Sequence, residues 1–161
     1  MASFSIGAEI QVPQQDAKTF LKEFQQAVSG IDAMGIFKHN ASIGLPMFVP
    51  GFGIPWGLFA SASTGLAFSA LVSTTPILAK IPPLAVLLVS PFGLMELAAY
   101  SIGMSRSFVL VWVIIKKGPI RQEIRPTIIE VGIAIALLLA GAFIEFAMIN
   151  QYGSVIVNPK S

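Results

Sequence analysis

The sequence predicts an all-α integral membrane protein with about four transmembrane helices, one of them broken or re-entrant, preceded by an amphipathic helix at the membrane interface. Three observations lead to this fold class. Of the 161 residues, 55% are hydrophobic and only 11% are charged, whereas about a quarter of the residues of soluble proteins are charged. No Asp, Glu, Lys or Arg lies between Lys38 and Lys80, which leaves room for about two spans of roughly 20 residues each. Two further apolar stretches follow, at 81–115 and 127–149.

We divide the chain into an N-terminal arm with the amphipathic helix (1–39), a polytopic membrane domain (40–149) and a C-terminal tail (150–161). Apolar residues alternate with smaller or polar ones from Phe4 to Val12, which predicts a short strand or extended arm. After Asp16, a candidate N-cap, apolar residues recur every three or four positions up to Ile31, as on one helix face. This helix is expected to lie in the membrane interface or to cover the protein's own spans. The strand-like run 155–157 in the tail is a candidate partner for the arm.

Proline and glycine interrupt the first membrane segment. Within about a dozen residues the chain places Pro46, Pro50, Gly51, Gly53, Pro55 and Gly57. One straight helix is therefore excluded. We predict a turn over 50–55, with one span before it that includes Asn40 and a second from Trp56 to about Leu78. Gly51 and Gly53 are expected to adopt a positive φ or to pack closely against another helix.

The stretch 81–115 is too long for one untilted span and too short for two spans with a turn. In one geometry the backbone breaks at Pro91 and Gly93, so that a short leg precedes a span over 94–115. In the other, a span over 82–104 is followed by a shallow segment. The lysine and arginine residues favour the first geometry, because the N-terminal helix, Lys80 and the loop 116–126 then share one side. This predicts that the N-terminus and that loop lie inside and the tail outside. The membrane is expected to be a prokaryotic cytoplasmic membrane.

Four ionisable residues lie at membrane depth or at its edge: Glu96, Arg106, Glu130 and Glu145. Such groups usually face the interior of a bundle, where they mark functional sites or pair with one another and fix the helix register. Glu96 and Glu145 each lie about 20 residues from a basic flank, so we expect a paired site between the third and last helices. One carboxyl should then hold a proton, or a cation or a partner's basic group should bridge the two. Arg106 and Glu130 are expected to form a separate ion pair.

Catalytic motifs are not found in the sequence. There is no phosphate-binding loop, no His-Glu-x-x-His and no Gly-x-Ser-x-Gly elbow. His39 is the single histidine and there is no cysteine, so we expect no metal site and no cofactor within the chain. The net charge of +2 is too small to suggest nucleic acid. The chain is therefore not expected to be an enzyme by itself.

Four short segments, in order along the chain, carry a resemblance to a known family. They are "IFKHN" at Ile36–Asn40, "TGLAFSAL" at Thr64–Leu71, "SPFGLMELAAYSIG" at Ser90–Gly103 and "AFIEFAMI" at Ala142–Ile149. With Pro91, Gly93 and Glu96 at the family's spacing, they resemble landmarks of the stage II sporulation protein M family. Phe92, Thr64 and Ser69 stand where that family has His, Asn and Gly, and its usual first transmembrane helix is absent. The resemblance implies a polytopic protein without known catalytic activity, which in spore formers acts with cell-wall-remodelling partners.

These observations favour a non-catalytic membrane accessory or scaffolding subunit of a larger complex. Its expected partners are the lipid bilayer and other membrane protein subunits or further copies of the chain. A first alternative is a transporter or permease-like subunit in which the intramembrane carboxylates form an ion or substrate path. A second is an accessory subunit of a multi-subunit membrane metal-dependent oxidase, whose metal ligands lie on other chains.

Overall fold

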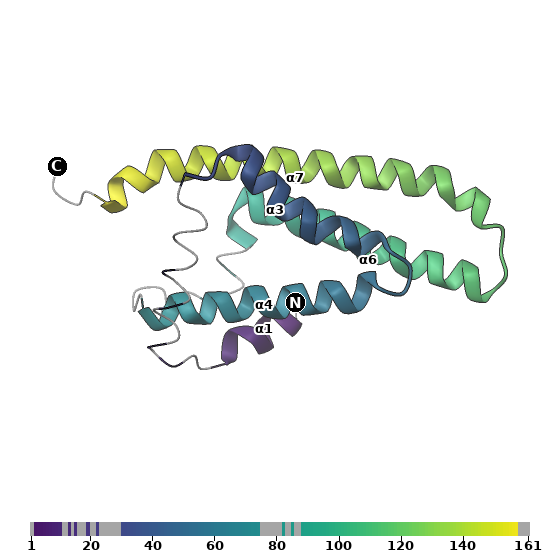
Figure 1. Ribbon diagram of the computed structural model, residues 1–161, viewed down its shortest axis with the longest axis horizontal. Helices are drawn as coiled ribbons and strands as arrows, with labels where there is room; N and C mark the ends of the chain where they lie inside the picture. The colour runs from purple at the N-terminus through teal and green to yellow at the C-terminus, as the bar shows by residue number, and fades with distance from the viewer. Residues whose placement is uncertain are drawn as a thin grey trace.

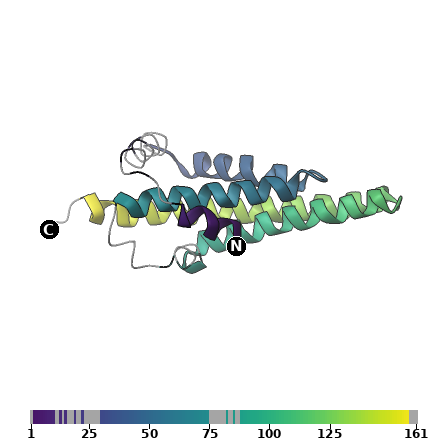
Figure 2. The same cartoon turned by 90° about the horizontal axis from the view of Figure 1, so that it is seen from below.

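In the computed structural model, the described residues are 2–10, 30–74 and 88–157, together with 13, 15, 19, 22, 82 and 85. They form the helices α1 (Ala2–Glu9), α3 (Ala33–Gly44), η1 (Leu45–Phe48), α4 (Gly53–Thr74), α6 (Pro91–Ile115) and α7 (Ile120–Val157). The described residues include no strand, which confirms the all-α prediction. The longer helices lie side by side along the longest axis of the molecule (Figure 1), and the view turned by 90° shows the same arrangement (Figure 2).

Contacts between the helices establish their directions. Asn40 of α3 contacts Glu96 of α6, and Gly44 lies against Tyr100, so α3 and α6 run parallel. On α4, Gly53 packs against Ser107 and Gly57 against Met104. On α7, Glu130 contacts Arg106 and Gly141 lies near Met95. Both α4 and α7 therefore run antiparallel to α6, and the α3–α4 turn lies toward the same end as the α6–α7 hairpin (Figure 1).

This arrangement removes the basis of the predicted orientation. The lysine and arginine argument placed residue 80 and the loop 116–126 on one side of the membrane. In the structure, α4 ends and α6 begins at the end opposite to the α6–α7 hairpin (Figure 1). If these helices cross the bilayer, the last residue of α4, Thr74, and the first of α6, Pro91, lie on the side opposite to the hairpin. The charges therefore do not support an N-terminus on the same side as the hairpin.

Among the described residues, two helices are long and apolar enough to cross a membrane. They are Pro91–Ile115, with a mean hydropathy of 1.6, and Ile120–Gln151, with a mean hydropathy of 2.4. Only 22% of either apolar window is buried. Length and composition thus give weak support to a membrane protein.

Alanine dominates the core between the helices. The central cluster of buried side chains consists of Ala41, Phe48, Ala99, Ala134 and Leu138. Ala142 is also fully buried. Such small side chains let helix backbones approach closely, which is the way helices associate where there is no water to drive their packing.

The prediction of a strand or extended arm near the N-terminus is wrong, because residues 2–9 form α1. This helix packs on the middle of α4, and each of the two helices contributes a glycine to the contact. A Cβ at Gly7 would overlap the Ala62 carbonyl, and a Cβ at Gly65 would overlap the Phe4 carbonyl. The Ser69 hydroxyl donates a 2.6 Å hydrogen bond to the Ile10 carbonyl just after α1. A helix satisfies its own backbone against another helix, whereas an isolated strand would leave its backbone groups unpaired.

The expected pairing of the arm with the tail is also wrong, since α7 continues as a helix to Val157. The amphipathic helix predicted from Asp16 lies almost entirely outside the described residues. Most of the short leg over 81–90 does too.

The helix boundaries follow the predicted breaks with small shifts. The extended backbone of Ser90, with ψ 126°, precedes Pro91 at the first turn of α6, where proline is favoured. Gly93 lies inside that helix, so the break is at Ser90 and Pro91 rather than at Gly93. Because α6 runs on through Met104 to Ile115, the geometry with a span over 82–104 is wrong. The α3–α4 break falls within the predicted turn, although α4 begins at Gly53, with Pro55 in its first turn.

The loop between the last two helices is shorter than predicted. The Lys117 amide donates to the Ile114 carbonyl at 3.0 Å and the Gly118 amide to the Val113 carbonyl at 2.9 Å, so that α6 ends in a Schellman motif. Pro119 then leads directly into α7, and Pro126 is inside this helix rather than at the end of a loop. The Thr127 hydroxyl donates to the Glu123 carbonyl at 2.6 Å.

Candidate functional site: two polar clusters between the helices

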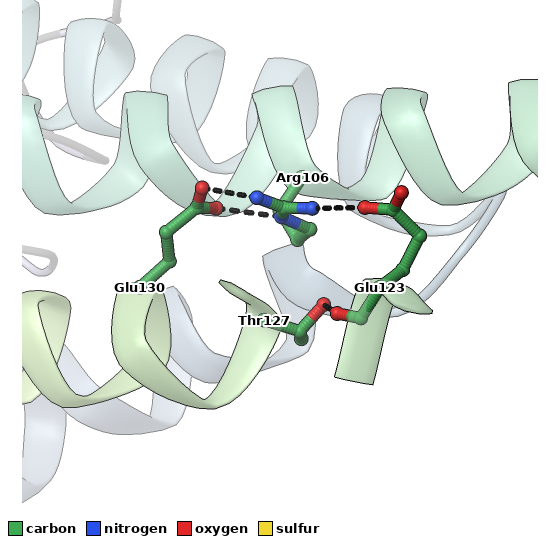
Figure 3. A network of polar contacts seen from close by, with 4 residues as sticks. All are labelled: Arg106, Glu123, Thr127 and Glu130. Carbon is green, nitrogen blue, oxygen red and sulfur yellow. Dashed lines mark hydrogen bonds and ion pairs between the residues drawn. The ribbon is translucent and has the colours of Figure 1, made fainter. Parts of the chain in front are cut away.

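Arg106 is the centre of the first polar cluster (Figure 3). Its Nε donates to Glu130 Oε2 at 2.7 Å, and its Nη2 contacts the other oxygen of the same carboxylate. Its Nη1 donates to Glu123 Oε2 at 2.8 Å. The arginine side chain is 9% exposed, against 26% for Glu123 and 30% for Glu130. The predicted Arg106–Glu130 ion pair is therefore present, and the sequence analysis missed Glu123 as its third member.

Helix spacing explains how the two carboxylates reach one guanidinium. Glu123 and Glu130 are seven residues apart on α7, about two turns, so both face α6. Arg106 lies between them, with one carboxylate on each side (Figure 3). In the sequence, the seven-residue spacing of Glu123 and Glu130 was the feature that could have indicated Glu123 as a second partner of Arg106. The cluster carries one positive and two negative charges, and its hydrogen bonds tie α6 to α7 in a single register.

The second polar cluster joins three helices. Asn40 of α3, which is 7% exposed, donates its side-chain amide to Glu96 Oε1 of α6 at 2.7 Å. The carboxylate of Glu145, on α7, lies within electrostatic range of Glu96 and of the Tyr100 hydroxyl. Within the described part of the chain, no basic side chain contacts either carboxylate. The helices that correspond to the third and last predicted spans, α6 and α7, are thus neighbours, as the sequence analysis expected.

Two members of this second cluster were missed as partners. Asn40 was named only as part of the first predicted span and as a landmark of the family resemblance, and Tyr100 was not singled out. Their signals were weak: Tyr100 follows Glu96 by four residues, which places both on one face of a helix, while nothing local links Asn40 to Glu96. Whether one of the two carboxyls holds a proton stays a prediction.

Three landmarks of the family resemblance meet in the second cluster. Asn40, Glu96 and Glu145 come from segments that are far apart in the sequence, and the fold brings them together between α3, α6 and α7. The fourth landmark, around Gly65, lies elsewhere, where α4 packs against α1.

The two glycines of the α3–α4 turn differ in their surroundings. Gly51 has a φ of 78°, and a Cβ there would lie 3.8 Å from the Val111 side chain, which is an ordinary contact. Gly53 has no unusual φ, but a Cβ would overlap the Met47 carbonyl oxygen and approach Ser107 Cβ to 2.6 Å. Gly51 therefore meets one condition expected from the sequence, a positive φ, and Gly53 meets the other, close packing against a neighbouring helix.

Nothing among the described residues groups three or more His, Cys, Asp or Glu side chains in a way that could hold a metal ion. His39 is exposed on α3.

No family model, curated protein or solved structure matches the chain. A functional proposal therefore rests on the fold and on the two polar clusters.

Proposed function

We propose that the protein is a non-catalytic integral membrane subunit that anchors or organises a larger complex in a prokaryotic cytoplasmic membrane. One observation carries the proposal: α6 and α7 are apolar over the length of a bilayer, yet only 22% of either apolar window is buried. Large apolar side chains such as Phe108, Ile128 and Phe143 are more than half exposed. Surface of this kind is unfavourable in water and marks contact with lipid or with other proteins.

The polar clusters support a structural role. Arg106 is bound on three of its nitrogens by two carboxylates, and Asn40 binds Glu96. Each contact joins different helices, so the polar groups hold the bundle together. The resemblance to the stage II sporulation protein M family points to the same class of non-catalytic membrane protein.

We further propose that α4 and the α3–η1 segment complete the set of spans. The 22 residues of α4 include no charged residue. The twelve residues of α3 and four of η1 rise by about 26 Å, somewhat less than the hydrocarbon thickness of about 30 Å. The bilayer would have to thin locally, or neighbouring subunits would have to cover this segment.

A transporter subunit is the second candidate, and the carboxylates of the second cluster favour it. Glu96 and Glu145 lie between helices without a basic partner among the described residues. Intramembrane carboxylates of this kind form proton or cation paths in transporters. One copy offers few spans, so this function would require several copies.

Membrane extraction followed by purification tests the proposal. The protein should stay with membranes washed in alkaline carbonate, and it should co-purify in mild detergent with a reproducible set of other membrane proteins. Release by carbonate would contradict membrane integration. A homo-oligomer without partners that moves ions into liposomes would favour the transporter instead.

A further inference from the structure

Four cations crowd the end of the molecule where α6 turns into α7. This basic hairpin consists of Lys116, Lys117, Arg121 and Arg125, all of which are exposed. Lys116 and Lys117 belong to the tight turn after α6, whereas Arg121 and Arg125 are four residues apart and so share one face of α7.

The nearby acidic residue Glu123 does not neutralise these cations. Glu123 lies between Arg121 and Arg125 in the sequence, but its carboxylate is turned inward to Arg106. In the described structure none of the four cations has a carboxylate partner. Together with Arg106, Glu123 and Glu130, this end of the bundle carries five positive and two negative charges.

Aromatic side chains lie directly behind the basic hairpin. Trp112 is 55% exposed, and the Lys116 ammonium lies 5.0 Å from the centre of its ring. Phe52, in the α3–α4 turn, stacks on Trp56 in the first turn of α4 with ring centres 5.6 Å apart. Gly51 is close to Val111, so the aromatic residues of the turn and Trp112 lie at a similar level along the bundle. Tryptophan at the end of an apolar helix is typical of the membrane–water interface.

We propose that the basic hairpin binds the phosphate groups of anionic phospholipids at the membrane surface. The order along the bundle is an apolar helix surface, then aromatic residues, then unneutralised cations, and this matches the order of acyl chains, interface and headgroups. Clusters of basic residues next to a span attract anionic lipids. The inference rests on the proposed membrane integration and adds the lipid class. By the positive-inside rule, the hairpin faces the cytoplasm.

The backbone of Lys117 offers a clean test. Its φ of 51° is left-handed, at the position of the Schellman motif where glycine is usual. Lysine there adds a charge to the surface against the preference of the backbone. Lys117→Gly therefore removes the charge while the turn keeps, or improves, its conformation.

The test uses the full-length protein in a neutral detergent, with phosphatidylglycerol and phosphatidylcholine as probes and native mass spectrometry to count bound lipid. The wild type should bind phosphatidylglycerol more tightly than phosphatidylcholine. Each removed charge should weaken phosphatidylglycerol binding by about fivefold, so Lys117→Gly, Arg121→Gln and Arg125→Gln together should weaken it by about a hundredfold. Lys38→Gln is the matched control, because Lys38 is exposed on α3 near the level of Glu96, about 30 Å along α6 from the hairpin.

Unchanged phosphatidylglycerol binding by the triple variant would overturn the inference, as would an equal loss in Lys38→Gln. Inorganic phosphate that displaces phosphatidylglycerol at equal concentration would argue against a lipid surface. Nanodiscs separate this failure from that of the proposed function. A wild type that stays in phosphatidylcholine nanodiscs but shows no preference for phosphatidylglycerol refutes the lipid site alone, whereas a protein that stays out of them refutes membrane integration.

Discussion

Individual charged residues in this protein are balanced in two different ways. Arg106 has two carboxylates, and both belong to the neighbouring helix. Glu96 has the amide of Asn40, and a second carboxylate, that of Glu145, lies within electrostatic range of it. An ion pair that loses one member leaves an uncompensated charge, whereas a carboxyl held by an amide can be replaced by a neutral group that accepts the same hydrogen bond.

Substitutions of Glu96 should separate hydrogen bonding from charge. Glu96→Gln keeps an acceptor for Asn40 and removes the repulsion from Glu145, so we expect little loss of stability. Glu96→Leu leaves the buried Asn40 amide without its acceptor and should cost about 1–3 kcal/mol. Thermal unfolding in detergent measures the difference.

The double variant Asn40→Leu, Glu96→Leu is the control for this experiment. It removes both polar partners and should recover much of the loss of Glu96→Leu. Equal destabilisation by Gln and Leu at residue 96 would mean that the Asn40 contact contributes nothing.

Removing Arg106 should leave two carboxylates of α7, Glu123 and Glu130, facing α6 without a cation between them. Arg106→Gln is expected to destabilise the protein by roughly 2 kcal/mol, below the range for fully buried pairs because Glu123 and Glu130 are partly exposed. Adding Glu123→Gln and Glu130→Gln should restore much of the stability. A triple variant less stable than Arg106→Gln alone would show that the carboxylates have other favourable contacts.

At the scale of elements, glycine and proline decide where helices end and how closely they approach. Pro91 begins α6 because its missing amide hydrogen is not needed in a first turn. Gly7 and Gly65 let α1 lie directly on α4. The α3–α4 turn needs one glycine for its backbone conformation and another for space.

The glycines of the turn should respond differently to alanine. Gly51→Ala places a Cβ on a left-handed backbone and should cost about 1 kcal/mol. Gly53→Ala forces a Cβ into the Met47 carbonyl and should cost about 2 kcal/mol or more. Gly132→Ala is the control, because a Cβ there meets nothing within 4 Å and helix propensity favours alanine by about 0.5–1 kcal/mol. Equal stability of all three variants in thermal unfolding would show that the α3–α4 turn is not packed as described.

At the scale of the whole molecule, the antiparallel order of helices makes a prediction about sidedness. If α4, α6 and α7 cross the bilayer, the α3–α4 turn and the α6–α7 hairpin face the same side, while the far end of α7 faces the other. Because the chain has no cysteine, single substitutions can be labelled without interference. Phe52→Cys and Lys117→Cys should react with an impermeant maleimide from one side of sealed vesicles, and Asn150→Cys from the other. Labelling of positions 52 and 117 from opposite sides would contradict the helix directions.

The sequence by itself determined the features that depend on local chemistry. Long apolar runs predicted helices without strands in the membrane domain, and the proline and glycine residues near 50 and 91 marked the breaks. The charges within apolar runs predicted that Arg106 pairs with Glu130, since an isolated charge there is too costly to leave unpaired. Each of these features follows from a few neighbouring residues or from a strong energetic penalty.

Only the tertiary structure decided the features that depend on which surfaces meet. Alternating apolar residues near the N-terminus suit a strand, but contact with α4 favours a helix, because glycine on both partners lets the two backbones touch. Asn40 as the donor to Glu96 and Glu123 as the third member of the Arg106 cluster depend on helix rotation and register, which sequence spacing leaves open. The direction of each helix was likewise decided by packing. Packing of α7 against α6 directs the Glu123 carboxylate to the buried Arg106 and away from the basic hairpin, whose four cations stay on the surface. Exposed cations are solvated by water, so an ion pair with them would stabilise the protein little.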